Sequence, residues 1–278
     1  MNLSEALRRT RSALEPVTDE APLEAQLLVE KAAGVSRSAL LTHPERELTA
    51  EQSAALAELT ARRSQGTPLP YILGEWGFYG HMFRVNPAVL IPRPETELLV
   101  EEASDWLKRH PEIRMGYDIG TGSGCIAVSL LLDRPDLRMT AVDRSREALK
   151  TAVANALDLG CGERFFPVLG DLASALRGGS ALICANLPYI PSETCEDLEA
   201  ARFEPLSALD GGSDGFELYR RLFADLAPRI QTGSLLLCEI EYRQEQLAAE
   251  TAAAYFPNAD IRVMKDLAGQ PRLLRIEE

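Results

Sequence analysis

Residues 118–124 read Asp-Ile-Gly-Thr-Gly-Ser-Gly, and this stretch decides the fold class of the 278-residue chain. It lies where a short expected strand, 117–120, ends and an apolar helical pattern, 125–132, begins. Glycines at such a junction allow positive φ angles and let a ligand approach the backbone closely. The helix start behind them offers unpaired N–H groups to an anion or a carboxylate. Taken alone, the run is compatible with a dinucleotide site, an S-adenosylmethionine site or only a tight turn.

Strand and helix patterns alternate from about residue 113 onward. Besides 117–120, strands are expected at 139–142, 166–169, 181–185, 234–240, 261–264 and 273–276, and helices at 125–132, 145–159, 216–226 and 244–255. Repeated βα units predict an α/β fold, a Rossmann-like and mostly parallel seven-stranded sheet with helices on both faces. The last two strands lie too close for a helical crossover, so they are expected to pair antiparallel.

Acidic residues follow the second and third strands of this series. Asp143 ends the second strand, where a carboxylate can accept hydrogen bonds from both hydroxyls of a ribose. Asp171 follows the third strand and is placed to reach an adenine edge. Either acid alone is compatible with a solvated loop residue. Glycine, acid and acid at three successive strand ends predict a nucleoside site, because open α/β sheets bind ligands at these ends.

The first 66 residues predict a small helical unit. Gly34 ends one helical run, Ser36 can cap the next, and Thr49 with Gln52 has the form of a capping box. Aromatic and β-branched residues separated by glycines at 71–85 then predict a β-hairpin linker. A further helix is expected to open at 92–97.

Composition limits the partners and the location of the protein. The net charge of −13 disfavours direct nucleic-acid binding. No apolar run approaches the roughly 20 residues that span a bilayer, and residues 1–12 lack a secretory signal. The five cysteines are odd in number and widely spread, so neither a metal site nor a disulfide framework is expected. We expect a cytoplasmic monomer.

The tetrapeptide Asn186-Leu187-Pro188-Tyr189 follows the fourth strand, beside the glycine loop. Such residues are common in turns, so their position at the strand end is what makes them candidates. Together with the segments below, they make the chain strongly resemble the HemK/PrmC family of release factor glutamine N5-methyltransferases. The resemblance rests on residues 70–74, 90–97, 118–124, 141–143, Asn155, Glu204-Pro205, Ala208-Leu209, Gly211-Gly212, Asp214-Gly215, Glu239 and 266–272.

This resemblance implies a domain organisation, an activity and a set of site residues. The implied parts are a helical substrate-docking domain at 1–67, a β-hairpin linker at 68–90 and a methyltransferase domain at 91–278. The implied activity is methyl transfer from S-adenosylmethionine, with S-adenosylhomocysteine as product, to the glutamine of the Gly-Gly-Gln loop of peptide-chain release factors. The implied cofactor-binding residues are Asp118, Gly120, Thr121, Gly122, Ser123, Gly124, Asp143, Asp171, Leu172 and Asn186.

Asn186, Leu187, Pro188 and Tyr189 are the implied catalytic and substrate-binding residues. In related enzymes the asparagine oxygen and the next residue's carbonyl accept the two amide hydrogens of the substrate, and the tyrosine packs on the amide plane. The sequence departs from the family at Leu187, where proline is usual, and at Glu241, where glycine is usual. Leu187 keeps the carbonyl but loses proline's fixed φ. Two alternatives stay open, an adenine-N6 methyltransferase acting on DNA or RNA and a catalytically idle binding protein.

Overall fold

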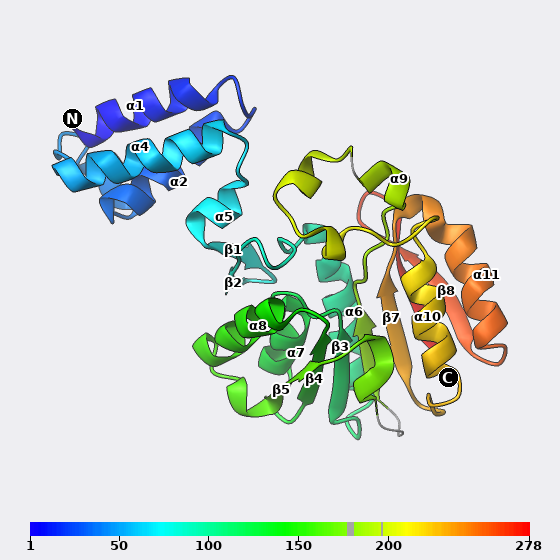
Figure 1. The fold of residues 1–278 in the computed structure, drawn as a ribbon. Helices are drawn as coiled ribbons and strands as arrows, with labels where there is room; N and C mark the ends of the chain where they lie inside the picture. Colours follow the sequence, from blue (N-terminus) through cyan, green and yellow to red (C-terminus); the bar gives the residue numbers. More distant parts are fainter. Residues whose placement is uncertain (177–180, 196) are drawn as a thin grey trace. The chain divides into compact units, whose positions relative to one another are not determined.

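The computed structural model describes residues 1–176, 181–195 and 197–278 (Figure 1). The chain divides into two compact units, Met1–Glu75 and Trp76–Glu278. Within the described ranges, no helix combines the length and the apolar character that crossing a membrane requires.

The first unit is helical, as predicted. Its helices are α1 (Leu3–Leu14), α2 (Ala21–Ala33), α3 (Arg37–Thr42), α4 (Ala50–Ser64) and α5 (Leu69–Leu73). The predicted end signals are in place, because Gly34 ends α2 with a φ of 63° and Ser36 caps α3. Thr49 and Gln52 form a reciprocal capping box at the start of α4. Local signals of this kind act within one turn of helix, so they can be read from sequence.

A buried ion pair joins α2 to α4. The Arg63 guanidinium donates to both carboxylate oxygens of Glu24, at 2.6 Å from Nε and 3.0 Å from the second nitrogen. Both side chains are at least 85% buried. A bidentate contact between two buried charges fixes how the two helices pack. Removing either partner would leave the other charge buried without a counter-ion.

One expectation about the linker is wrong. Residues 71–73 were expected in the hairpin, but they lie in α5, which Pro70 opens in its first turn and Gly74 ends with a φ of 77°. Short apolar runs are ambiguous between strand and helix, and the proline and glycine positions decide for the helix here.

The predicted hairpin itself is confined to β1 (Glu75–Phe78) and β2 (His81–Arg84). Its turn residues Tyr79 and Gly80 both have positive φ, 47° and 75°, as a type I′ turn requires. Asn155 exchanges hydrogen bonds with the backbone of Arg84, at 2.7 and 3.1 Å, and also donates to the carbonyl of Ser123 at 2.8 Å. The hairpin is thereby tied to the glycine loop.

The second unit contains the predicted seven-stranded sheet, ordered β5-β4-β3-β6-β7-β9-β8 (Figure 1). Its strands are β3 (Met115–Ile119), β4 (Arg138–Asp143), β5 (Phe165–Leu169), β6 (Leu182–Ala185), β7 (Leu235–Glu239), β8 (Asp260–Lys265) and β9 (Pro271–Glu277). Neighbours from β5 to β7 pair parallel. As expected, β8 and β9 pair antiparallel, and β9 inserts antiparallel beside β7.

Helices cover both faces of this sheet. They are α6 (Glu97–Arg109), α7 (Cys125–Asp133), α8 (Arg146–Asp158), α10 (Glu217–Leu226) and α11 (Glu245–Tyr255), and the short helix α9 (Ser192–Cys195) follows the tetrapeptide. Apolar residues of α6, α7 and α8 form one core with one face of the strands, and those of α10 and α11 form a second core with the other face. The predicted helix opening at 92–97 is a short 3-10 turn, Pro94–Thr96, that leads into α6.

Replacing Arg63 with Met should destabilise the first unit by about 3 kcal/mol, because the carboxylate of Glu24 would remain buried without its partner. Chemical unfolding of the full chain, followed by circular dichroism, measures the change. Arg62→Met is the matched control, since this neighbouring side chain is exposed and its loss should change the stability by less than about 0.5 kcal/mol.

The double variant Glu24→Gln/Arg63→Met should recover most of the lost stability, because it also removes the carboxylate charge that Arg63→Met leaves unpaired. A double variant no more stable than Arg63→Met would contradict this account of the pair.

Candidate active site

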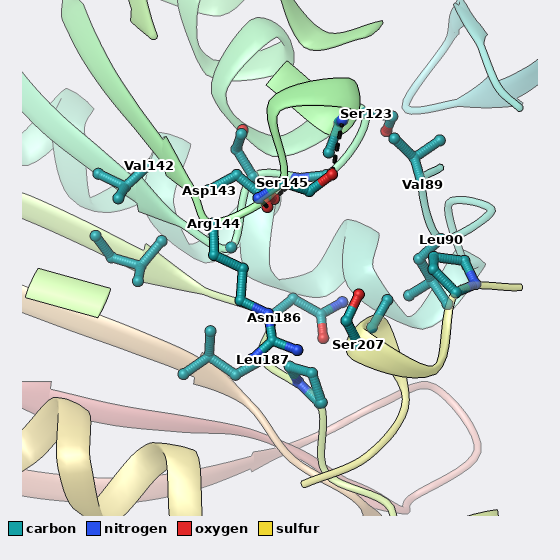
Figure 2. Close-up of a pocket in the computed structure, with 18 of the residues that line it drawn as sticks. Val89, Leu90, Ser123, Val142, Asp143, Arg144, Ser145, Asn186, Leu187 and Ser207 are labelled. Atoms are coloured by element: carbon teal, nitrogen blue, oxygen red, sulfur yellow. Dashed lines mark hydrogen bonds between the residues drawn. The ribbon is translucent and has the colours of Figure 1, made fainter. Parts of the chain in front are cut away.

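A pocket opens at the carboxyl ends of β3, β4, β5 and β6 (Figure 2). It contains about 980 Å³ of empty space, open solvent included. Its walls come from residues 119–123, 142–145, 170–172 and 186–188, and a facing wall comes from 88–90, 92–93, 205 and 207–208. The sequence placed a site at these strand ends, and the structure brings the predicted segments together there.

The glycine loop forms one wall of the pocket at the start of α7. Gly120, Gly122 and Gly124 have φ angles of 75°, 55° and 80°, which side-chain-bearing residues rarely adopt. Gly124 faces inward, where an added Cβ would lie 3.0 Å from the Cβ of Ala152. The loop therefore needs its glycines both for backbone conformation and for close packing on α8.

Asp118 lies beneath this loop and not at the pocket surface. Its side chain is fully buried, and Oδ2 accepts hydrogen bonds from the Thr121 hydroxyl at 2.6 Å and the Ala127 N–H at 3.3 Å. Burial raises the pKa of Asp118 to about 6. Its place in the structure is that of a support for the loop.

Asp143 lies at the end of β4, as predicted, and it lines the pocket. Its two carboxylate oxygens accept N–H groups of Gly122 at 2.9 Å and Ser145 at 2.8 Å. Each oxygen keeps capacity for a further hydrogen bond. The carboxylate is thus held at the pocket edge with room to bind hydroxyl groups of a ligand.

The two residues predicted after β5 also line the pocket. The carboxylate of Asp171 is exposed and accepts a hydrogen bond from Arg221 at 2.5 Å. Leu172 is buried and has a φ of 44°, a strained angle for leucine. Strain of this kind clusters at ligand sites.

Asn186 follows β6 and supplies a polar group to the pocket wall there. Its Nδ2 donates to the hydroxyl of Thr96 at 3.1 Å and to Oε2 of Glu239 at 3.0 Å. Because Nδ2 faces these partners, Oδ1 is left as an acceptor, and no described residue donates to it. Figure 2 shows Asn186 and Leu187 on one side of the pocket, with Asp143 and Ser145 on another.

Glu239 connects Asn186 to Tyr189. This carboxylate is 4% exposed, and its second oxygen accepts a hydrogen bond from the Tyr189 hydroxyl at 3.3 Å. Burial raises the pKa of Glu239 to about 7, and the charge of Glu95 raises it further, while hydrogen bonds from Thr96 and Tyr189 and the charge of Arg272 oppose the shift. Tyr189 is mostly buried and stands behind the pocket wall, whereas Pro188 lines it.

The backbone after Tyr189 is held by the segment 209–216. Ile190 exchanges hydrogen bonds with Leu209 and Gly211, at 3.0 and 2.8 Å. A Cβ on Gly211 would lie 2.6 Å from the carbonyl oxygen of Pro188, so only glycine allows this approach.

The residue that stands where the family usually has glycine, Glu241, starts a 3-10 turn with a φ of −72° and forms a reciprocal cap with Gln244. The side chain of Gln244 donates to the carbonyl of Tyr189 at 3.0 Å. A glycine is therefore not required at 241, and the turn helps to hold the tetrapeptide.

The segment 91–97 anchors three parts of the site. Arg93 donates a hydrogen bond to Glu204 at 2.5 Å, and the same carboxylate accepts a hydrogen bond from the N–H of Ile91 at 3.3 Å. These contacts join the pocket segment around Arg93 to the one that follows Glu204. Thr96 accepts from Asn186, and Glu97 accepts the N–H of Tyr79 at 2.8 Å.

Thr96, Glu239 and Tyr219 also contact the tetrapeptide, although no site role is predicted for them from the sequence. Thr96 and Glu239 belong to segments that carry the family resemblance, which is the signal that could have identified them. Tyr219, whose hydroxyl accepts the N–H of Leu187 at 3.1 Å, has no such signal.

The chain is similar in sequence to proteins of one named family. Residues 5–74 match the family described as PrmC N-terminal domain. The chain is 38% identical over 259 residues to the release factor glutamine methyltransferase of Caulobacter vibrioides, covering 92% of this chain and 89% of that protein. It is 39% identical over 282 residues to the protein of the same name from Koribacter versatilis, covering 99% and 98%.

This chain belongs to the release factor glutamine methyltransferase family. The fold is shared more widely among methyltransferases. The N-terminal domain of human METTL16, solved in complex with SAH, superimposes with a TM-score of 0.51 at 17% identity, covering 82% of each chain. At that identity the likeness concerns the fold alone.

Glu239 should titrate near pH 7, because burial opposes its ionisation. Carboxyl-carbon NMR of glutamate-labelled protein measures this directly, with Glu239→Gln identifying the resonance. Glu95→Gln should lower the pKa by removing a negative charge, and Arg272→Met should raise it by removing a positive charge. A titration midpoint near the ordinary glutamate value would contradict the burial argument.

Proposed function

We propose that this protein transfers a methyl group from S-adenosylmethionine to the side-chain amide nitrogen of the glutamine in the Gly-Gly-Gln loop of a peptide-chain release factor. The observation that carries the proposal is the pair of acceptors on one pocket wall. Oδ1 of Asn186 and the carbonyl oxygen of Leu187 receive no hydrogen bond from the described residues. A primary carboxamide has two N–H hydrogens, which match these two oxygens.

The residues at the ends of β3, β4 and β5 fit S-adenosylmethionine. Asp143 has spare acceptor capacity for the two ribose hydroxyls. The glycine loop and the N-terminus of α7 offer N–H groups to the carboxylate of the methionine part. Asp171 and Leu172 border the place for the adenine. When bound, this cofactor supplies an electrophilic methyl group on a sulfonium.

The chain's own contribution is placement of a poor nucleophile. The lone pair of an amide nitrogen is delocalised into its carbonyl, so the two acceptors both hold the NH₂ group and increase electron density on nitrogen. Tyr189 donates to Glu239 and so helps to hold the carboxylate that orients Asn186. Aligning reactants at about 3–3.5 Å can supply several kcal/mol of the barrier. One N–H hydrogen leaves as a proton when nitrogen gains the methyl group.

We also propose that the protein acts as a cytoplasmic monomer and does not bind nucleic acid directly. All five cysteines are free thiols, which suits a reducing compartment. The net charge of −13 is unfavourable for contact with a phosphate backbone.

The deciding experiment incubates the purified protein with S-adenosylmethionine and a purified release factor, followed by peptide mass spectrometry. The expected product is one added methyl group on the glutamine of the Gly-Gly-Gln loop. Oligonucleotides offered in the same reaction test the adenine-N6 alternative. Methylation of adenine instead of glutamine, or cofactor binding without any transfer, would overturn the proposal.

Asn186→Ala should reduce methyl transfer to below about one thousandth, because one of the two amide acceptors is lost together with the side chain that Glu239 orients. Cofactor affinity should change by less than about threefold, since the glycine loop and Asp143 are intact. Transfer assays and calorimetric titration with S-adenosylmethionine measure the two effects. Near-normal turnover in this variant would refute the assignment of Asn186.

Asp143→Ala should have the opposite profile, with cofactor affinity lowered about 10- to 100-fold because hydrogen bonds to a charged acceptor are lost. At saturating cofactor, turnover should recover to within about fivefold of the unmodified protein. Asp136→Ala is the matched control, an exposed acid that lies outside the pocket and pairs with arginines. Unchanged affinity in Asp143→Ala would contradict the ribose assignment.

A further inference from the structure

The N–H of Leu187 is the feature that distinguishes this tetrapeptide from the family's proline-containing version. Proline has no N–H, whereas leucine at this position brings a donor into a buried place. Leu187 is 3% exposed and lies beyond the paired end of β6, since Ala185 is the last residue paired with β3 and β7. A buried N–H without an acceptor is costly, so the chain must provide one.

Tyr219 of α10 provides that acceptor. Its hydroxyl oxygen accepts the N–H of Leu187 at 3.1 Å and donates to the backbone carbonyl of Glu239, with the carbonyl of Ala185 3.3 Å away. Tyr219 is fully buried, and its ring packs against Phe216 and Phe223, with ring centroids 5.0 and 6.1 Å away. This one hydroxyl thus connects the end of β6, the end of β7 and the tetrapeptide.

The side chain of Leu187 makes a second, separate contact. It packs over the glycine loop, where its Cδ2 lies 3.0 Å from the position that a Cβ on Gly120 would occupy. The N–H and the side chain can therefore be removed independently. Leu187→Ala removes the packing and keeps the donor, and Leu187→Pro removes the donor and keeps an apolar ring.

We propose that Tyr219 is a positioning residue for methyl transfer. Its hydroxyl holds the Leu187 peptide so that the Leu187 carbonyl faces the substrate amide. This hydrogen bond takes the place of the rigidity that proline gives other members of the family. The proposal rests on the proposed function, because it concerns the carbonyl that would accept one amide hydrogen. It predicts energetic coupling between Tyr219 and residue 187 through the N–H only.

The test measures the effect of Tyr219→Phe on kcat in three backgrounds, using the full chain, S-adenosylmethionine and a purified release factor. With leucine at 187, the loss of one hydrogen bond should lower kcat about 5- to 10-fold. The same penalty should persist in Leu187→Ala. In Leu187→Pro it should be at least threefold smaller, because there is no N–H to hold.

The KM for the release factor and the dissociation constant for S-adenosylmethionine should change by less than about twofold on Tyr219→Phe, which separates positioning from a general loss of structure. A penalty in Leu187→Pro within threefold of that in the unmodified background would overturn the proposal. So would an effect confined to KM or to thermal stability.

Amide hydrogen exchange of Leu187 in leucine-labelled protein provides a readout that does not need activity. Tyr219→Phe should accelerate this exchange at least 10-fold, while the amide of Leu237 in the centre of β7 serves as the internal control. Unchanged exchange would show that the hydroxyl does not hold the Leu187 N–H. If the unmodified protein transfers no methyl group to a release factor, the proposed function fails, and the exchange result still decides the role of the hydrogen bond.

Discussion

The contact between the buried carboxylate of Glu239 and the Asn186 side chain is the interaction on which the site depends. A side-chain amide can turn either its oxygen or its nitrogen toward a ligand. The oxygen would accept a hydrogen bond from the ligand, whereas the nitrogen would donate one. The carboxylate and the hydroxyl of Thr96 face Nδ2, so Oδ1 is directed away from them. Tyr189 and Thr96 donate hydrogen bonds to the buried carboxylate of Glu239, and burial still raises its pKa to about 7. The orientation of this amide thus follows from its hydrogen bonds to one buried acid and one hydroxyl.

The close approach of neighbouring backbone segments is the second constraint on the site. The oxygens that would accept hydrogen bonds from a substrate lie in the irregular segment beyond the sheet. Gly120 leaves space for the Leu187 side chain, and Gly211 leaves space for the carbonyl of Pro188. Hydrogen bonds from Gln244 and to Tyr219 then hold the same segment. A loop that is held from the glycine loop, α10 and the 209–216 segment loses little entropy when a ligand binds, which favours accurate placement of reactants.

The family segment at 91–97 shows how one short stretch can serve several contacts. Arg93, Thr96 and Glu97 each bind a different part of the unit, namely Glu204, Asn186 and the hairpin backbone at Tyr79. At the two positions where this chain departs from the family pattern, nearby side chains likewise make hydrogen bonds that hold the site. Glu241 forms a cap with Gln244, and the N–H that Leu187 introduces is accepted by Tyr219.

Sequence alone determined the features that depend on neighbouring residues: the capping box at 49–52, the glycine loop at 118–124 and the alternation that predicts the sheet. Hydrophobic period, φ preference and helix capping act over a few positions, so one chain reveals them. Only the tertiary structure decided that residues 69–73 form a helix and that Thr96, Glu239 and Tyr219 meet the tetrapeptide. Thr96 and Glu239 lie 90 and 53 residues from Asn186, and contacts at such separations arise when strands assemble side by side, which leaves no periodic signal in a single sequence.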